Sequence, residues 1–450
     1  MTRSCAEAAR PALCLALLLA ACATTGRKAQ DPASRLRAAQ DDLAAGRSAE
    51  AQQEFEDVLA RDPHELAAIR GRIEAARKRG GLDAVAREAE AATAARPADA
   101  YAWYALGLSR FAAGDEGAAV RALEKAASLR PDEADIQYRL GVALLDGEKF
   151  AAARTPLEAA VRLGPKTARY RMPLATCLAR LGEHRAAVDA LRDLPSLQPA
   201  PDEAALGVKV ARTLTDPFRD LPQPARAELE QALGYLVRDA PGLAVAPLEA
   251  LLQKMPNLAP AHALLGLAEA RLDESGRAVT ELKRAAELAP DLPQPHAYLA
   301  ELYGSKDRPE LAAQEYLESL QRDPLDPQTL RRLGVLRLEH GGGPALDPLA
   351  QAAALAPADD ELQLLLARAE IGAGQAARAR DRLDRLAQRR PDDPEVLLRL
   401  ALVLFDERVR ATGPERDRLG ERVEKLLDRV LTLQPGNATA SRLLSTLKAG

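Results

Sequence analysis

The sequence predicts an all-α protein built as a solenoid, in which pairs of antiparallel helices stack on one another. Composition favours helices, because only 3% of the 450 residues are aromatic while Ala, Leu, Arg and Glu dominate. A repeated residue then indicates the architecture. Prolines recur 34 residues apart at positions 63, 97, 131, 165 and 199, and again at 256, 290 and 324. Such a period indicates stacked units rather than the three globular domains that ~150 residues per domain would give.

Residues 1–21 are predicted to be a cleaved signal peptide. Their apolar run, over 12–21, is too short to cross a bilayer. The run leads into Leu19-Ala20-Ala21-Cys22, which resembles the lipobox of bacterial lipoprotein signal peptides. That resemblance implies that Cys22 is acylated and becomes the first residue of a mature, membrane-tethered protein. Ala23, in place of Asp, favours the outer membrane, with the protein facing the periplasm.

The net charge argues against binding of nucleic acid, and the cysteine content argues against a disulfide in the mature chain. Lys and Arg number 62 and Asp and Glu number 66, so the net charge is −4 and no excess of cations is present to bind nucleic acid. Cys5 and Cys14 leave with the signal peptide and Cys22 is consumed by lipid, so only Cys177 remains. We therefore expect no disulfide within the mature chain, and its stability must come from packing.

Other positions repeat with the prolines. Twelve residues before each proline of the series stands Ala or Val, and the residue eight before it is apolar and usually Leu. In the third unit, Trp103-x2-Leu106-Gly107, Ala119-x3-Leu123 and Pro131 together resemble the tetratricopeptide repeat family, although Arg110 replaces its tyrosine. The resemblance covers about residues 32–435 and implies a right-handed superhelix of antiparallel helix pairs. Prolines at 357, 391 and 435 complete a series of eleven units.

The spacing also has a physical explanation. A small residue at the position of Gly107 lets the two helices of a unit approach closely, and turns such as Ala113-Gly114-Asp115 join them. The proline at the end of each unit prevents its second helix from continuing. Because no single pair can bury its apolar face alone, neighbouring pairs must form one continuous core.

Two interruptions divide the series into blocks. Three prolines within residues 216–224 rule out a continuous helix there, and about ten extra residues within Phe405–Arg418 are expected to extend a helix and add a solvated loop. We expect, in order, a signal peptide at 1–21, an acylated tether at 22–33, five repeats at 34–199, an extra helix and Pro-rich break at 200–224, six repeats at 225–435 and a capping helix at 436–450.

No motif indicates catalysis. The sequence has no glycine-rich phosphate loop, His-Glu-x-x-His motif or nucleophile elbow, and Gly341–Gly343 is expected to be a turn. His262 and His296 stand 34 residues apart, but nothing nearby completes a metal site, so we expect them to pack where Trp103 packs. Cys177 is expected to be a buried, unreactive thiol. The protein is thus predicted to be no enzyme and to need neither a metal nor a cofactor.

The family resemblance implies a concave groove that is lined by the first helix of each unit. Aromatic residues and arginine dominate binding hot spots, although the tyrosines could instead pack along the inside of the superhelix. Arg70, Glu74 and Arg77 stand where chaperone-binding members of the family need Lys and Asn, which disfavours a chaperone co-factor. The residues predicted to bind a partner in the groove are Arg70, Arg77, Tyr101, Tyr104, Leu108, Phe111, Tyr138 and Arg169.

These features predict a non-enzymatic, lipid-anchored scaffold that binds other proteins, or peptide segments of them, in the bacterial cell envelope. Lipoproteins of this appearance commonly assist the assembly or export of secretins, pili, polysaccharide or outer-membrane proteins. The alternative is a polysaccharide- or peptidoglycan-binding component of an export machine, in which groove aromatics stack on sugars. An enzyme with a cryptic site at His262 or His296 is a third possibility. Neither a nucleic acid nor a small-molecule substrate is expected.

Overall fold

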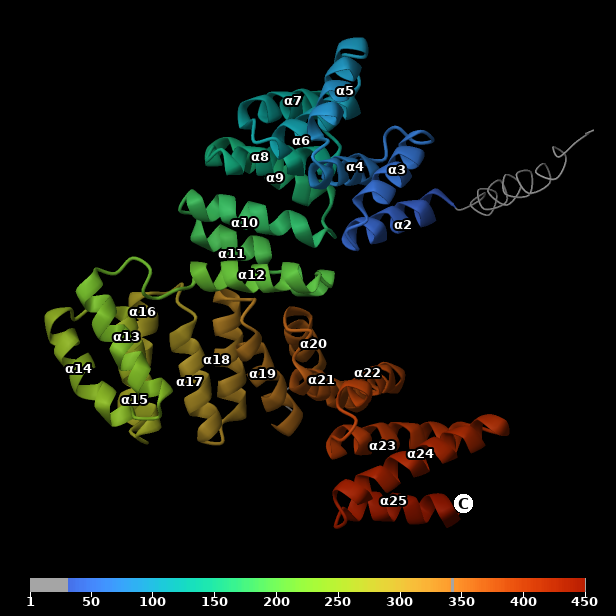
Figure 1. Ribbon diagram of the computed structural model, residues 1–450. Coiled ribbons are helices and arrows are strands. Elements are labelled where there is room, and N and C mark those ends of the chain that lie inside the picture. The colour runs from blue at the N-terminus through green and yellow to red at the C-terminus, as the bar shows by residue number, and fades with distance from the viewer. Residues whose placement is uncertain (1–30, 341–343, 450) are drawn as a thin grey trace, which may run out of the picture. The chain divides into compact units, whose positions relative to one another are not determined.

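The computed structural model describes residues 31–340 and 344–449, and every regular element within them is helical. The predicted signal peptide, Cys22 and the tether up to residue 30 lie outside the described residues, as do Gly341–Gly343. The described residues form eleven antiparallel helix pairs, five before the single helix α12 and six after it, and a final helix, α25 (Figure 1). The predicted all-α solenoid of about eleven repeats in two blocks is therefore confirmed.

The chain divides into two compact units, residues 1–164 and 165–450. The first unit contains four helix pairs, each joined by a short turn. They are α2 (Pro32–Ala44) with α3 (Ser48–Leu59), α4 (Leu66–Arg79) with α5 (Leu82–Ala95), α6 (Ala100–Ala112) with α7 (Glu116–Leu129), and α8 (Ala134–Asp146) with α9 (Phe150–Leu163).

The second unit begins with a fifth pair and α12, and continues with the six later pairs and α25. Its helices are η1 (Ala168–Tyr170), α10 (Arg171–Arg180), α11 (His184–Leu191), η2 (Leu194–Leu197), α12 (Pro201–Leu214), α13 (Gln223–Val237), α14 (Pro241–Lys254), α15 (Ala259–Arg271), α16 (Ser275–Leu288), α17 (Gln294–Ser305), α18 (Pro309–Arg322), α19 (Pro327–His340), α20 (Leu346–Leu355), α21 (Asp360–Gly372), α22 (Ala376–Arg389), α23 (Pro394–Arg410), α24 (Pro414–Leu433) and α25 (Ala438–Ala449). The extra residues near 405–418 lengthen α23 and α24, so only 411–413 remain between them.

Glycine sets the distance between the two helices of several pairs. A Cβ atom on Gly107 would lie 2.6 Å from Leu123 Cγ, and one on Gly141 would lie 2.5 Å from Leu157 Cγ. Both leucines are buried. The small residue predicted at this position is therefore required by a leucine from the second helix of the same pair.

The first helix of many pairs is fastened to the proline before it. Trp103 Nε1 donates a hydrogen bond of 2.9 Å to the carbonyl oxygen of Pro97, six residues earlier. Nε2 of His262 lies 3.0 Å from the carbonyl oxygen of Pro256, which is also six residues earlier. The same arrangement recurs at Gln137, Arg171 and Gln363. His262 thus takes the place of Trp103, as the sequence predicts, and satisfies a carbonyl that a helix end leaves free.

The boundary between the compact units lies at 164/165, inside the first predicted block rather than at the Pro-rich break. The reason is that the fifth pair and α12 pack against the later pairs. Gly207 of α12 lies against Leu194 and Leu325, and the Thr215 hydroxyl donates to the buried carboxylate of Asp323 at 3.2 Å. The contacts of Gly207 with Leu325 and of Thr215 with Asp323 join segments more than 100 residues apart.

Candidate functional site

The first unit contains a cavity of about 560 Å³ that is lined by the first helices of four consecutive pairs. Leu43 comes from α2, Arg70 and Arg77 from α4, Leu108 and Phe111 from α6, and Arg139 from α8. We call this cavity the first-unit groove. The consecutive first helices bring together side chains that are up to 99 residues apart, from Gln40 to Arg139.

The floor of the first-unit groove is apolar. Ile73 and Leu108 are 5% and 7% exposed, whereas Phe111 is half-buried and presents part of its ring. Phe55 also reaches the groove, past Gly71, where a Cβ atom would lie 2.1 Å from the end of the phenylalanine ring. This floor can take up the apolar side chain of a ligand.

Arginines give the groove a positive charge. Arg77 is exposed and makes a two-pronged ion pair with Glu74, at 2.8 and 2.7 Å, which raises the pKa of Arg77 and lowers the pKa of Glu74. Arg139 Nε is buried and has no hydrogen-bond partner, and its guanidinium lies 5.2 Å from the centre of the Tyr138 ring. Three arginines and one glutamate line the cavity, so an anionic ligand group is favoured there.

Tyr104 does not face the groove, which corrects the sequence prediction. Its side chain is fully buried, and its hydroxyl donates a hydrogen bond to the Asp135 carboxylate, which is also paired with Arg70 at 2.7 Å. Burial, together with this carboxylate, raises the pKa of Tyr104. Burial opposes the charge of Arg70, but Asp135 and Tyr104 outweigh it and raise the pKa of Arg70. Tyr104 therefore helps to hold the Asp135 carboxylate, which in turn fixes the position of the Arg70 side chain.

Three other predicted residues are placed elsewhere. Tyr101 stacks on His64, with ring centres 4.4 Å apart, and lines a separate cavity of about 280 Å³. Tyr138 lies beside Arg139 but is not among the residues that line the groove. Arg169 belongs to the second unit, where its guanidinium lies 5.2 Å from the Tyr170 ring.

Four of the eight predicted residues thus line the groove: Arg70, Arg77, Leu108 and Phe111. Arg139 is not among the predicted residues, because it stands one position after Tyr138, the residue that the family pattern assigns to the groove. Its position next to an aromatic residue on a first helix was the only sequence signal for it.

The second unit contains a buried carboxylate with incomplete pairing. Glu269 of α15 and Glu370 of α21 each stand 21 residues before the closing proline of their repeat. Glu370 accepts two hydrogen bonds from Arg382, at 3.0 and 2.8 Å. Twelve residues after Glu269 the chain has Glu281 instead, which pairs with His262, so Glu269 is left with one contact, to Arg277 at 2.8 Å. Burial, and then the nearby Glu281, Glu274 and Glu249, raise the pKa of Glu269 to about 7 although Arg277 opposes them.

We expect the second unit to lose stability as the pH rises from about 4.5 to about 7. Glu269 binds a proton more tightly in the folded chain than in the unfolded chain, so its contribution is complete at low pH and is lost as it ionises. Glu269→Gln should flatten this dependence and raise the free energy of unfolding at pH 8 by about 1–2 kcal/mol. Urea unfolding at pH 5 and pH 8 measures both effects, and equal pH dependence in the two proteins would contradict the assignment.

Nothing in residues 31–340 and 344–449 points to a metal or a membrane span. No group of three or more His, Cys, Asp or Glu side chains there could hold a metal ion. None of the helices described is both long enough and apolar enough to cross a bilayer. Cys177 is buried and makes no disulfide.

Comparisons with known proteins match the repeats. Two sequence models of the tetratricopeptide repeat match this chain, one at residues 104–165 and 138–204 and the other at 345–402. No curated protein sequence matches it.

Three solved structures illustrate the similarity. PilF of Pseudomonas aeruginosa is 21% identical and covers 50% of this chain and 98% of its own, with a TM-score of 0.40. YrrB, described as a protein with an unusual peptide-binding site, is 15% identical over 43% of this chain and 96% of its own, with a TM-score of 0.38. A chain of the Cut9–Hcn1 complex is 14% identical over 94% of this chain and 98% of its own, with a TM-score of 0.36.

Proposed function

Because the chain carries tetratricopeptide repeats, we propose that it is a non-enzymatic scaffold of the bacterial cell envelope that holds a segment of another protein in its first-unit groove. The segment carries an acidic group next to an apolar side chain. Through acylated Cys22 the scaffold is anchored to the outer membrane and acts in the assembly or export of envelope components.

One observation carries this proposal: four consecutive first helices line a single cavity that combines an apolar floor with three arginines. A peptide segment can place an apolar side chain on Leu108 and Phe111 and a carboxylate near Arg139. Arginine and aromatic residues supply most of the binding free energy at such interfaces. Arg139 Nε is a buried donor that no group of the protein satisfies, so a ligand acceptor there would remove a desolvation cost.

The alternative, glycan binding by stacked aromatics, has less support. Stacking on sugars needs exposed ring faces grouped in one groove. Of the four aromatic residues predicted to line the groove, only Phe111 does so, because Tyr104 is buried, Tyr101 stacks on His64 and Tyr138 does not line the cavity.

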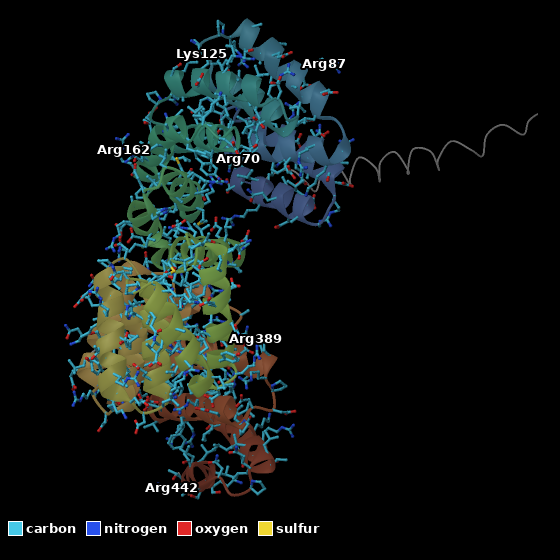
Figure 2. All side chains as sticks on the ribbon, turned by 90° about the vertical axis from the view of Figure 1, so that its left-hand side faces the viewer. Arg70, Arg87, Lys125, Arg162, Arg389 and Arg442 are labelled. Carbon is cyan, nitrogen blue, oxygen red and sulfur yellow. The ribbon has the colours of Figure 1, made fainter. Side chains whose placement is uncertain are left out.

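Crosslinking in the native host tests the proposed function. A photoreactive amino acid in place of Phe111 should crosslink to one partner protein, and the attached peptide should contain Asp or Glu beside an apolar residue. The control position is Arg87 on α5, which is exposed and lies at the outer edge of the first unit, whereas Arg70 lies among its helices (Figure 2). Crosslinks to glycan only, or equal crosslinking from both positions, would contradict the proposal.

We expect Arg139→Gln to weaken binding of that partner segment by at least a factor of about ten. The substitution removes a charge-assisted hydrogen bond of roughly 1.5–3 kcal/mol while keeping a polar side chain of similar length. Fluorescence anisotropy with the crosslinked segment as a labelled peptide measures the change. Arg87→Gln is the matched control and should leave the affinity unchanged, because Arg87 lies outside the cavity.

The anchor has its own test. We expect Cys22→Ser to abolish labelling with a radioactive fatty acid and to leave the protein either released from the membrane fraction or with its signal peptide uncleaved. Since α2 begins at Pro32, the nine residues from 23 to 31 place the first helix pair within ~30 Å of the bilayer at ~3.5 Å per residue. Fatty-acid labelling that persists in the variant, or unchanged membrane fractionation of a cleaved variant, would exclude this anchor without affecting the groove.

A further inference from the structure

The Pro-rich break between the two blocks of repeats lines cavities in the second unit. Asp216 and Pro217, together with Gln294 of α17, belong to the lining of two cavities, which therefore adjoin. The break thus does more than separate the two blocks, because it forms part of a surface together with α13, α15 and α17, the first helices of three consecutive pairs.

The first of the two cavities is apolar and measures about 310 Å³. Phe218 from the break is 8% exposed and packs with the core of the later pairs. It lines the cavity together with Leu233 of α13 and Leu264 of α15. Tyr298 of α17 adds a largely buried ring, and burial raises the pKa of Tyr298 to about 12, so its hydroxyl stays neutral. The space suits one large apolar side chain.

The second cavity measures about 500 Å³ and is acidic. Three carboxylates, of Asp216, Asp323 and Asp326, line this cavity against the single arginine Arg212, so its lining has a net negative formal charge. Asp323 is 8% exposed, and burial, with the nearby Asp326, raises the pKa of Asp323 to about 6, which leaves it ionised at neutral pH. An anionic ligand is therefore disfavoured here, and a cationic group is favoured.

Gln294 supplies a further, independent indication. Its Nε2 donates a hydrogen bond of 3.1 Å to the carbonyl oxygen of Thr215, which fixes the orientation of the amide. Its Oε1 is buried and has no hydrogen-bond partner. A buried acceptor of this kind is satisfied when a ligand brings an N–H donor.

We propose that the two adjoining cavities are a second binding site, which takes a partner segment with an arginine or lysine side chain next to a large apolar side chain. The apolar residue occupies the cavity beside Phe218, and the cationic group lies among Asp216, Asp323 and Asp326, within reach of Gln294. The charge preference is opposite to that of the first-unit groove, and the inference does not depend on that groove.

A defined peptide tests the proposal on the chain from Ala23 onward. The probe is a fluorescein-labelled peptide Gly-Arg-Phe-Arg-Gly, with Gly-Glu-Phe-Glu-Gly and Gly-Arg-Ala-Arg-Gly as comparison peptides, measured by fluorescence anisotropy at neutral pH. We expect saturable binding of the first peptide and at least tenfold weaker binding of the other two. The peptide with Arg and Ala controls for general attraction of cations to an acidic protein.

Two substitutions on one helix locate the site. Ala263 of α15 lines the apolar cavity and Ala270, two turns further along the same face, does not. Ala263→Leu should fill the cavity and weaken binding at least tenfold, whereas Ala270→Leu should leave it unchanged, and circular dichroism checks that both remain folded. Absence of saturable binding, equal binding of the Glu peptide, or full binding by folded Ala263→Leu would each overturn the proposal.

Discussion

Replacing Asp135 by Ala is expected to destabilise the first unit by about 3–5 kcal/mol. Asp135 is 4% exposed, accepts the hydrogen bond from Tyr104 and pairs with Arg70. Without the carboxylate, a partly buried guanidinium and a fully buried hydroxyl both lose their partner, and removing one member of a buried pair carries this cost. Trp103, the only tryptophan in the chain, neighbours Tyr104, so its fluorescence during urea unfolding reports on this unit.

An exposed ion pair on α4, the helix that carries Arg70, provides the control for Asp135. Glu74 and Arg77 lie 2.7 Å apart but are 39% and 52% exposed, so Glu74→Ala should change stability by less than ~1 kcal/mol. If both substitutions had equally small effects, the network beneath the groove would not support the fold. Asp135→Ala should also weaken partner binding, because Arg70 is no longer held in place.

Replacing Gly266 by Ala is expected to destabilise the α15/α16 pair by about 2–3 kcal/mol, although alanine favours helices more than glycine does. The new Cβ would lie 2.6 Å from Leu282 Cγ and 3.0 Å from the backbone oxygen of Ala278. Leu282 is fully buried, so the two helices must move apart. Hydrogen exchange of the backbone amides in α15 and α16 measures the loss of stability of this helix pair. A local measurement is needed because a long repeat array need not unfold in one step.

Gly276→Ala is the matched control for Gly266. Gly276 lies in α16, is exposed, and a Cβ atom there would meet nothing within 4 Å. Because Gly276 is the second residue of α16, this substitution should change stability by no more than roughly 0.5 kcal/mol, in the stabilising direction that helix propensity gives. If Gly266→Ala and Gly276→Ala changed stability in the same direction, close contact between α15 and α16 would not be the reason why residue 266 is glycine.

The repeat pattern predicts the fold because the repeated residues are those that contact one another between adjacent helices. The 34-residue spacing of prolines, and small residues such as Gly107 opposite Leu123, specify each helix pair and its packing. The boundary at 164/165 could not be predicted in this way. This boundary depends on the packing of Gly207 against Leu325. The two residues are more than 100 positions apart in the sequence, and the repeat pattern predicts contacts only between neighbouring helices.

The groove was predicted in part for a related reason. Helix periodicity places Tyr104 and Leu108 on one face of α6, but only Leu108 lines the groove. Periodicity does not show that Asp135 of α8 pairs with Tyr104 and Arg70, so Tyr104 was wrongly expected to reach the surface. Arg139 was missed because its side chain enters the groove from a position that the family pattern leaves out.

The packing of Gly207 against Leu194 and Leu325 has a practical consequence for dividing the gene. Expressing residues up to the Pro-rich break would leave α12 without the later helices that cover it, and would invite aggregation of the exposed face. A fragment that stops at Gly164 avoids this problem, since it keeps whole a unit that is compact by itself. The ends of the repeat blocks in the sequence therefore do not show where this protein can be divided into stable fragments.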